Sequence, residues 1–367
     1  MKFDRRLALN FDWPLLFLTI LIASIGIINL YSASSAGKEL SGTPIYLKQI
    51  YWVAIGMFLM IICFSVDSRT FERFAFPLFM LTVILLILTV PFGKSVSGSR
   101  RWLQLGVISL QPSELLKITL ILTLAKYLKK YRAQKLGITR SLIVPIFMLA
   151  MPTVLILQQP DLGTALIVLL IFFSLLIFNG IRMRTFLVMI SVFLAGFPLF
   201  WHYLRDYQKM RILTFINPNL DPLDSGYHLI QSKIAVGSGV FWGKGFLRGT
   251  QNQLHFLPEQ KTDFVFSVLA EEWGFVGAFI VVGLYLLLII LSLRVAGSVK
   301  EEFGAFVSVG IVSMLFWHIL INIGMSIGII PVVGVPLPFM SYGGSSTITF
   351  FIGIGLLMNI SMRRFLF

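Results

Sequence analysis

The run PLLFLTILIASIGIINLY at residues 14–31 decides the fold class. It contains no charged side chain and is long enough to cross a bilayer as a helix, which takes about 20 apolar residues. Basic residues precede it and no small-residue cleavage site ends it, so we expect a transmembrane helix rather than a removed signal peptide. The whole 367-residue chain shares this character, being 57% hydrophobic and only 13% charged. Soluble domains are about a quarter charged, so lipid is expected to cover much of this apolar surface.

Similar apolar runs recur along the chain at a length that suits transmembrane helices. We expect ten of them, near residues 13–32, 46–66, 71–92, 112–129, 141–158, 163–180, 185–203, 264–293, 304–330 and 345–361. Together they predict an all-α polytopic membrane protein with about ten transmembrane helices. Because the sequence shows no low-complexity tract and no soluble domain, residues 1–367 are expected to form a single transmembrane domain.

The distribution of basic residues predicts the orientation of these helices. Lys and Arg gather in the segments on the same side as the N-terminus. The short segments on the other side contain only Lys38, Lys48, Lys94, Arg100 and Arg101. Cytoplasmic loops carry such an excess, so both termini are expected in the cytoplasm. The net charge of +14 is then explained by contact with anionic membrane lipids, and we expect no nucleic-acid partner.

One connection is much longer than the others. Residues 204–263 are expected to form an extracytoplasmic loop between the seventh and eighth helices, rich in glycine and in charged residues. Within it, residues 226–239 could form a short amphipathic helix on the outer leaflet. Long loops are often functional, and the mixed aromatic and charged content of this one favours an ordered structure.

Signatures of several soluble enzyme classes are missing. The sequence has no P-loop, no GxGxxG after a strand, no HExxH and no GxSxG, which argues against an ATP-driven engine. The sequence has a single cysteine, Cys63, within an apolar run. Because a disulfide needs two cysteines, an internal disulfide is excluded, and no Cys/His set for a metal exists.

Glu114 and Lys117 are spaced three residues apart in QPSELLK, which places them on one face of a helix that starts near Pro112. Ionisable residues at membrane depth are costly and need a reason. One interpretation is an internal ion pair that only fixes helix packing. The other is a cation that Glu114 holds ready for an anionic head group, near the side of the long loop.

Further ionisable residues lie near the eighth and ninth helices. Asp263 opens the eighth helix, where a carboxylate is favourable simply because it faces the helix N-terminus. Glu271 and Glu272 are expected about two turns deeper, with at least one facing a protein interior. His318 is more typical of a satisfied polar contact than of a proton carrier.

Two uncharged or nearly uncharged loops also stand out. In QQPDLGT, Asp161 is expected to cap the following helix. The segment 331–346, PVVGVPLPFMSYGGSS, cannot continue a helix because of its prolines and glycines. Irregular backbone at membrane depth must be buried in protein or line a cavity, so this segment is expected to shape a lipid or glycan groove.

Five motifs resemble those of the SEDS family, the proteins of shape, elongation, division and sporulation. They are QPSELLK (111–117), QQPDLGTA (158–165), DPLDSGYHLIQSKIAVGSG (221–239), FLPEQKTDFVFSVLAEE (256–272) and PVVGVPLPFMSYGGSS (331–346). They occur in family order over nearly the whole chain, and several are too long for a chance match. Their wording is closer to the RodA-type elongation members than to the FtsW-type division members.

The resemblance implies an activity, a substrate and partners. SEDS proteins polymerise lipid II, a disaccharide-pentapeptide on undecaprenyl pyrophosphate, into glycan strands of peptidoglycan. They work with a class B penicillin-binding protein, a transpeptidase, and with other elongation-complex proteins. The family's essential aspartate falls on Asp263, and its membrane Glu and Lys fall on Glu114 and Lys117. We therefore expect a bacterial inner-membrane enzyme whose active site faces outward.

The implied chemistry is an inverting glycosyl transfer. It needs a base for the acceptor hydroxyl and charge stabilisation for the departing pyrophosphate. Asp263 is the expected base, although a helix N-terminus lowers a carboxylate pKa and would weaken it. The expected stabilisers of the pyrophosphate are Lys117, Arg101, Arg211 and Lys233. No resident cofactor is expected; a divalent cation, Mg²⁺ or Mn²⁺, could share the task, but the sequence offers no dedicated carboxylate cage.

Two other functions remain open on the residues alone. A lipid II flippase would use Glu114, Lys117 and His318 along a path, but a flippase needs polar groups through the full depth of the membrane. Here they cluster at the outer end, with Glu271, Glu272 and His318 as the exceptions. A non-catalytic scaffold for a penicillin-binding protein would make substitutions of Asp263 silent in vitro.

Overall fold

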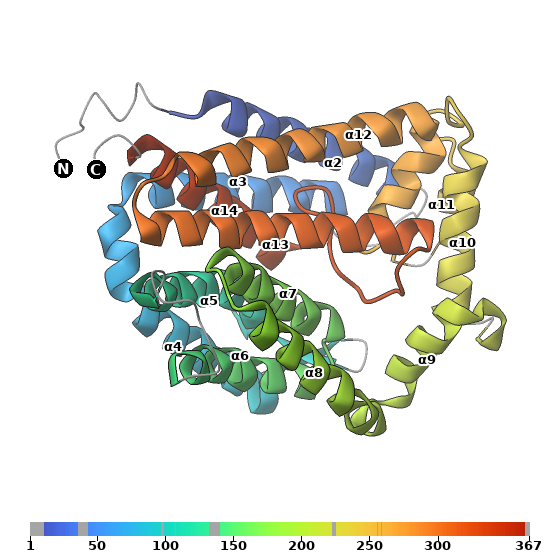
Figure 1. The fold of residues 1–367 in the computed structure, drawn as a ribbon. Coiled ribbons are helices and arrows are strands. Elements are labelled where there is room, and N and C mark those ends of the chain that lie inside the picture. The colour runs from blue at the N-terminus through green and yellow to red at the C-terminus, as the bar shows by residue number, and fades with distance from the viewer. Residues whose placement is uncertain are drawn as a thin grey trace.

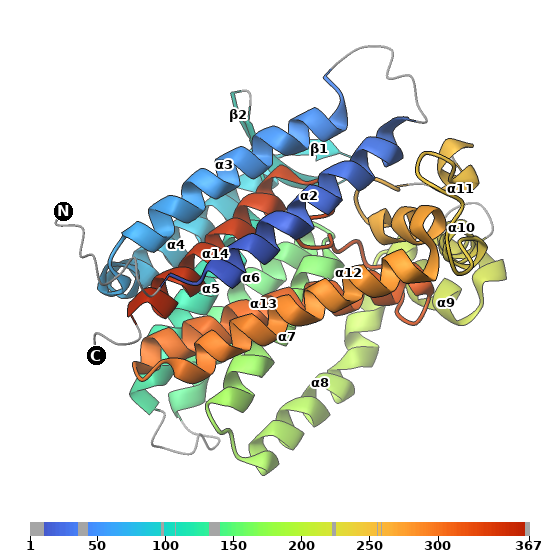
Figure 2. The ribbon, with the colours of Figure 1, turned by 90° about the horizontal axis from the view of Figure 1, so that it is seen from above.

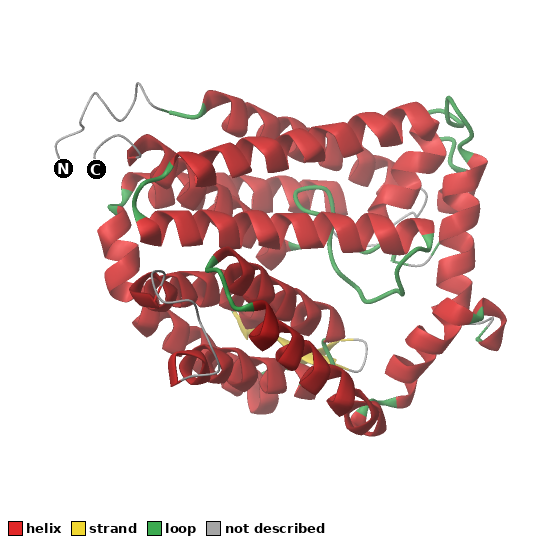
Figure 3. Ribbon diagram, in the orientation of Figure 1, coloured by secondary structure: helices red, strands yellow, loops and turns green. Residues whose placement is uncertain are grey.

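The computed structural model describes residues 11–35, 43–96, 99–106, 108–131, 140–221, 225–254, 256–257 and 259–363. Helices dominate (Figure 3). Each expected transmembrane run coincides with a helix: α2 (Trp13–Ser35), α3 (Ile45–Ser65), α4 (Ser68–Phe92), α5 (Pro112–Leu128), α6 (Arg140–Gln158), α7 (Leu162–Phe178), α8 (Met183–Tyr203), α12 (Val265–Ser298), α13 (Glu302–Ile327) and α14 (Gly344–Arg363). Six of them, α2, α3, α4, α12, α13 and α14, are long and apolar enough to cross a membrane. The chain is thus a multi-pass membrane protein, and the crossing of all ten helices stays a prediction.

The helices form a bundle with a few helices enclosed by the others (Figures 1 and 2). Helix α5 is buried on almost every side, and α14 packs against α3, α5 and α13. Phe350 and Phe351 of α14 are buried in this core. The outer helices instead expose large apolar side chains, such as Phe58 of α3, Ile84 of α4 and Val192 of α8. Such a surface is suited to lipid and would be unfavourable in water.

The first and last helices meet at one end of the bundle (Figure 1). The hydroxyl of Ser361, near the end of α14, donates a hydrogen bond of 3.5 Å to Oδ2 of Asp12, just before α2. The rings of Phe11 and Phe64 are 5.5 Å apart at the same end. A chain that crosses a membrane an even number of times has both ends on the same side, and the closeness of these two ends agrees with that. That this end is cytoplasmic stays a prediction.

The expected helix at residues 264–293 is present as α12, but α12 is broken at Gly274, which the sequence did not indicate. This glycine has φ 65° and ψ −163°, a conformation that other residues avoid. The N–H groups that the break releases, those of Phe275 and Val276, donate to the carbonyls of Val240 and Phe241 at 2.9 and 3.2 Å. Residues 265–273 therefore form a short segment, and the long membrane helix begins after the break.

The all-α expectation also misses a small sheet in the connection before α5. Strands β1 (Lys94–Val96), β2 (Ser99–Leu105) and β3 (Ile108–Leu110) pair antiparallel in the order β1-β2-β3. The sheet lies at the end of the bundle opposite the first residues of α2 (Figure 2).

The long loop is ordered over its described residues, as expected. It contains α9 (Asp206–Ile216), the 3-10 turn η2 (Pro218–Leu220), α10 (Ser225–Ser238) and α11 (Thr250–Gln253). Helix α10 corresponds to the expected helix at 226–239, and it packs against α12 and α13. The segment between α13 and α14 has no regular helix, also as expected, and it returns among the helices (Figure 3).

Candidate active site

Asp263 is held between the long loop and the segment that follows α13. Its backbone N–H donates to the carbonyl of Glu259 at 3.1 Å. Its own carbonyl accepts a hydrogen bond of 2.9 Å from Nδ2 of Asn322 on α13. The same Nδ2 donates to the carbonyl of Val335 at 2.7 Å. Asn322 therefore fixes Asp263 and the irregular segment 331–343 relative to each other.

The carboxylate of Asp263 shares its surroundings with Arg211 of α9. A Cβ built on Gly334 would lie 3.3 Å from Oδ2 of Asp263 and 3.9 Å from Nη1 of Arg211. Gly334 has φ +74°, so glycine is needed here both for the backbone and for the space. The guanidinium of Arg211 lies 5.8 Å from the ring centre of Tyr207 on its own helix. The structure thus brings together two predicted site residues that are far apart in sequence.

The half-buried position of Asp263 changes its acidity. Burial, together with the charges of Glu259 and Asp161, raises the pKa of Asp263 to about 6, against the opposing charges of Arg211 and Arg101. Desolvation therefore outweighs the lowering effect that a helix N-terminus has on a carboxylate pKa. A carboxylate with a pKa near the working pH is well suited to take up a proton during a reaction.

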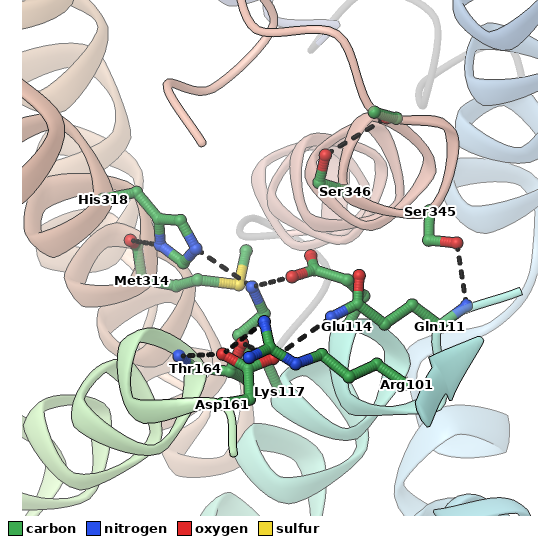
Figure 4. A network of polar contacts seen from close by, with 11 residues as sticks. Arg101, Gln111, Glu114, Lys117, Asp161, Thr164, Met314, His318, Ser345 and Ser346 are labelled. Atoms are coloured by element: carbon green, nitrogen blue, oxygen red, sulfur yellow. Dashed lines mark hydrogen bonds and ion pairs between the residues drawn. The ribbon is translucent and has the colours of Figure 1, made fainter. Parts of the chain in front are cut away.

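Arg101, on β2, lies beside Asp161 at the start of α7 (Figure 4). Its Nε donates to the carbonyl of Gln159 at 3.0 Å, and Nη2 donates to the carbonyl of Pro160. Nη1 lies 3.7 Å from Oδ1 of Asp161. Asp161 also accepts a bond of 3.1 Å from the N–H of Thr164, which confirms its predicted capping role. Arg101 keeps 27% of its side chain exposed, so it is available to an anion.

Glu114 and Lys117 form the predicted ion pair, together with His318 (Figure 4). Lys117 Nζ donates to Oε1 of Glu114 at 2.9 Å and lies 2.9 Å from Nε2 of His318. Since Nδ1 of His318 faces the carbonyl of Met314 at 2.8 Å, that nitrogen carries the proton and Nε2 accepts. All three side chains are buried, and Lys117 is only 1% exposed. A lipid phosphate would reach Lys117 only by replacing one of these partners, so its part in substrate binding stays a prediction.

Lys233 lies on α10 and is exposed. Its chain covers the end of α13, because a Cβ built on Gly328 would lie 1.8 Å from Cε of Lys233 and 2.7 Å from Nζ. This places its ammonium on the side of the long loop, and its contact with a pyrophosphate stays a prediction.

Glu271 and Glu272 have structural partners. Oε1 of Glu271 accepts from Nζ of Lys244 at 2.7 Å and from the N–H of Gln251 at 3.0 Å. Oε1 of Glu272 accepts from the hydroxyl of Ser32 at 2.5 Å. These contacts tie the long loop and α2 to the first segment of α12, so both glutamates explain how the loop is held.

Asn322 and Gly334 belong to the site but were not expected from the sequence. The available signals were an uncharged polar residue within a membrane helix, and a glycine among valines and prolines. Within the described ranges, no three His, Cys, Asp or Glu side chains form a group that could hold a metal ion. A role for Mg²⁺ or Mn²⁺ stays a prediction.

Comparison with known proteins assigns the family. A family model that covers FtsW, RodA and SpoVE, described as cell cycle protein, matches residues 12–365. The chain belongs to this family. The resemblance to SEDS proteins that the motifs indicated is thereby confirmed. The FtsW/RodA/SpoVE match leaves only short stretches at either end of the chain uncovered.

Relatives within the family have named activities. The chain is 41% identical over 349 residues to the peptidoglycan glycosyltransferase MrdB of Escherichia coli K12, covering 95% of this chain and 93% of the relative. It is 36% identical to the peptidoglycan glycosyltransferase RodA of Treponema pallidum, covering 97% and 98%.

Two solved structures share the fold. One is a chain from the structure described as "Structural coordination of polymerization and crosslinking by a peptidoglycan synthase complex". It has a TM-score of 0.82 and 31% identity, and the match covers 97% of this chain and 98% of that one. The other is the rod shape determining protein RodA of Thermus thermophilus, with TM-score 0.72, 30% identity and the same coverage.

Proposed function

We propose that this family member is a peptidoglycan glycosyltransferase that polymerises lipid II during cell-wall elongation and so maintains rod shape. The observation that carries the proposal is the surroundings of Asp263, a carboxylate with a pKa of about 6 beside the guanidinium of Arg211. The names of relatives at 36–41% identity over most of the chain support it.

Asp263 acts as the general base in the proposed reaction. The C4 hydroxyl of an acceptor GlcNAc attacks the anomeric carbon of a donor MurNAc and gives its proton to the carboxylate. The new bond between that oxygen and the anomeric carbon forms as the bond to the pyrophosphate oxygen breaks, which inverts the anomeric centre. The electron pair leaves with the lipid pyrophosphate, and the cleavage of that bond makes a nucleotide unnecessary.

Arg211 and Arg101 stabilise the departing pyrophosphate. Both charges act on Asp263, so both lie within electrostatic range of the reacting atoms. Guanidinium groups suit this role because they bind phosphate oxygens in a fixed fork geometry. Lys233 on α10 adds a third cation on the side of the long loop.

Glu114, Lys117 and His318 support the site by linking α5 to α13. His318 and Asn322 are four residues apart on α13 and so lie on the same face of that helix. The buried contact between Lys117 and His318 therefore fixes the helix whose Asn322 holds Asp263. In this proposal the pair binds substrate only if the lipid displaces one of the internal partners.

We also propose that the site faces outward from the bacterial inner membrane and that a class B penicillin-binding protein cross-links the product alongside other elongation-complex proteins. The bias of basic residues toward the opposite ends of the helices supports this orientation. The similar chain in a peptidoglycan synthase complex supports a partner of this kind.

The proposal is tested with the purified full-length chain, alone and with its penicillin-binding partner, supplied with lipid II. Glycan polymer and transbilayer movement of lipid II in liposomes are scored separately, for the wild type and for Asp263→Ala. Polymer from the wild type but not from the variant is the expected result. Translocation without polymer would support a flippase, and polymer that needs the partner and is unaffected by the substitution would support a scaffold.

A further inference from the structure

A cavity of about 440 Å³ has Thr262, the residue before Asp263, in its wall. Its other side chains are mainly aromatic or polar: Trp52, Lys94, Trp102, Gln104, Ser109 and Tyr342. They come from α3, the small sheet and the segment before α14. None of these residues is assigned a role in the glycosyl transfer proposed above.

The strand β2 divides the cavity from the cationic part of the site. Trp102 is paired with Lys94 on β1, and Gln104 is paired with Ser109 on β3. All four line the cavity. Since successive side chains of a strand point to opposite faces, Arg101 points away from the cavity, toward Asp161. One strand therefore presents a guanidinium to the carboxylates on one side and an indole to the cavity on the other.

The aromatic wall is held in position by the backbone around it. A Cβ built on Gly344 would lie 2.5 Å from Cε2 of Trp52, so the indole lies directly on the backbone at the start of α14. The N–H of Tyr342 donates to the carbonyl of Lys261 at 2.9 Å, which fixes the backbone of Tyr342 next to that of Thr262. A ring that is already ordered loses little entropy when it binds a ligand.

The chemistry of the wall fits a sugar ring better than a phosphate or a lipid chain. Aromatic faces contact the C–H faces of a pyranose, and the amide of Gln104 and the hydroxyls of Ser109 and Thr262 can bond to its hydroxyl and acetamido groups. Among the lining residues that the structure describes, Lys94 is the one charged side chain, whereas a pyrophosphate would need several cations. The volume falls within the range of small-ligand sites, about 300–1,000 Å³.

We propose that this cavity is a saccharide subsite, which binds an N-acetylhexosamine ring of the glycan next to Asp263. The inference rests on the proposed function. The cavity would hold either the sugar whose hydroxyl Asp263 deprotonates or the sugar next to that one in the glycan. Lys94 then lies where it can pair with a carboxylate of the attached lactyl-peptide.

The test compares Trp102→Ala and Trp102→Phe in the full-length protein, with Trp13→Ala as the matched control. Trp13 is 66% exposed at the far end of α2, away from the cavity. We expect Trp102→Ala to raise the KM for lipid II about tenfold, equivalent to about 1.4 kcal/mol, with a smaller effect on kcat. Trp102→Phe keeps an aromatic face and should restore most of the affinity, whereas Trp13→Ala should match the wild type.

A second measurement does not depend on turnover. Saturation-transfer NMR is recorded with the disaccharide-pentapeptide that lacks both lipid and pyrophosphate. Gln104→Ala is added as a second variant, because Gln104 is exposed and its truncation should not affect folding. Saturation of the sugar protons by the wild type, weakened in Gln104→Ala and Trp102→Ala, is expected.

Unchanged KM and unchanged saturation transfer in these variants would overturn the subsite. So would inorganic pyrophosphate that binds the wild type and competes with the disaccharide for this cavity. A wild type that makes no polymer yet binds the disaccharide through Trp102 would instead refute the proposed function and leave the subsite intact.

Discussion

Gly334→Ala tests the geometry around Asp263 with the smallest available change. The added methyl carbon would lie 3.3 Å from Oδ2 of Asp263, so the carboxylate has to move by a few tenths of an ångström. A misplacement of 1 Å can cost about 100-fold in rate, so we expect kcat to fall about threefold to tenfold. The φ of +74° adds a backbone cost of about 1–2 kcal/mol. The assay is lipid II polymerisation, with thermal unfolding measured on the same preparations.

Gly180→Ala is the matched control for this prediction. Gly180 has φ +82°, and its added methyl carbon would meet no atom within 4 Å, so the substitution carries the same backbone cost without a steric contact. It should lower stability to a similar extent while leaving kcat unchanged. A wild-type rate for Gly334→Ala, or an equal loss of rate in both variants, would refute the argument.

Three further outcomes follow from the site. The polymerisation rate should fall about tenfold per pH unit below about pH 6, since protonated Asp263 cannot accept a proton, and a rate that stays level through more acidic conditions would contradict this. Because the pKa of Asp263 is raised in the folded state, ionising Asp263 destabilises the fold as pH rises past the ordinary aspartate pKa, by about 3 kcal/mol at most. Asp263→Asn should therefore raise the Tm at about pH 8 but not at about pH 4. Equal Tm shifts at both pH values would argue against a raised pKa. Lys117→Met leaves Glu114 buried and unpaired and should cost about 3–5 kcal/mol of stability. The double variant with Glu114→Gln should recover part of this loss. If the stability losses of the two single variants, measured by thermal unfolding, simply add in the double variant, the ion pair is contradicted.

The helix positions could be predicted because lipid leaves the chain few alternatives. A backbone in hydrocarbon must satisfy its own hydrogen bonds, so an apolar run of spanning length becomes a helix. The break in α12 could not be predicted in this way. The left-handed conformation of Gly274 depends on the carbonyls of Val240 and Phe241, which reach it only through the folded loop. The small sheet was missed for a similar reason, because its short strands carry no strong pattern of their own.

The candidate site was predictable where a buried charge needed an explanation. The cost of ionisable groups at membrane depth is enough to single out Glu114 and Lys117 in the sequence, whereas Asp263 was singled out by the resemblance to SEDS proteins. Asn322 and Gly334 are uncharged, and they matter only because the segment after α13 folds back onto Asp263. The direction of the Asp263 pKa was also beyond the sequence, since burial by distant segments outweighs the local effect of the helix N-terminus.

The most direct test of Asp263 as the general base is the single-turnover rate of lipid II polymerisation, measured at about pH 7.5 with the purified protein and its partner. Asp263→Asn preserves the shape of the side chain but cannot accept the proton. The rate should fall by at least about 100-fold, with lipid II still bound and the Tm equal to or above that of the wild type. A variant that polymerises lipid II at the wild-type rate would contradict the mechanism.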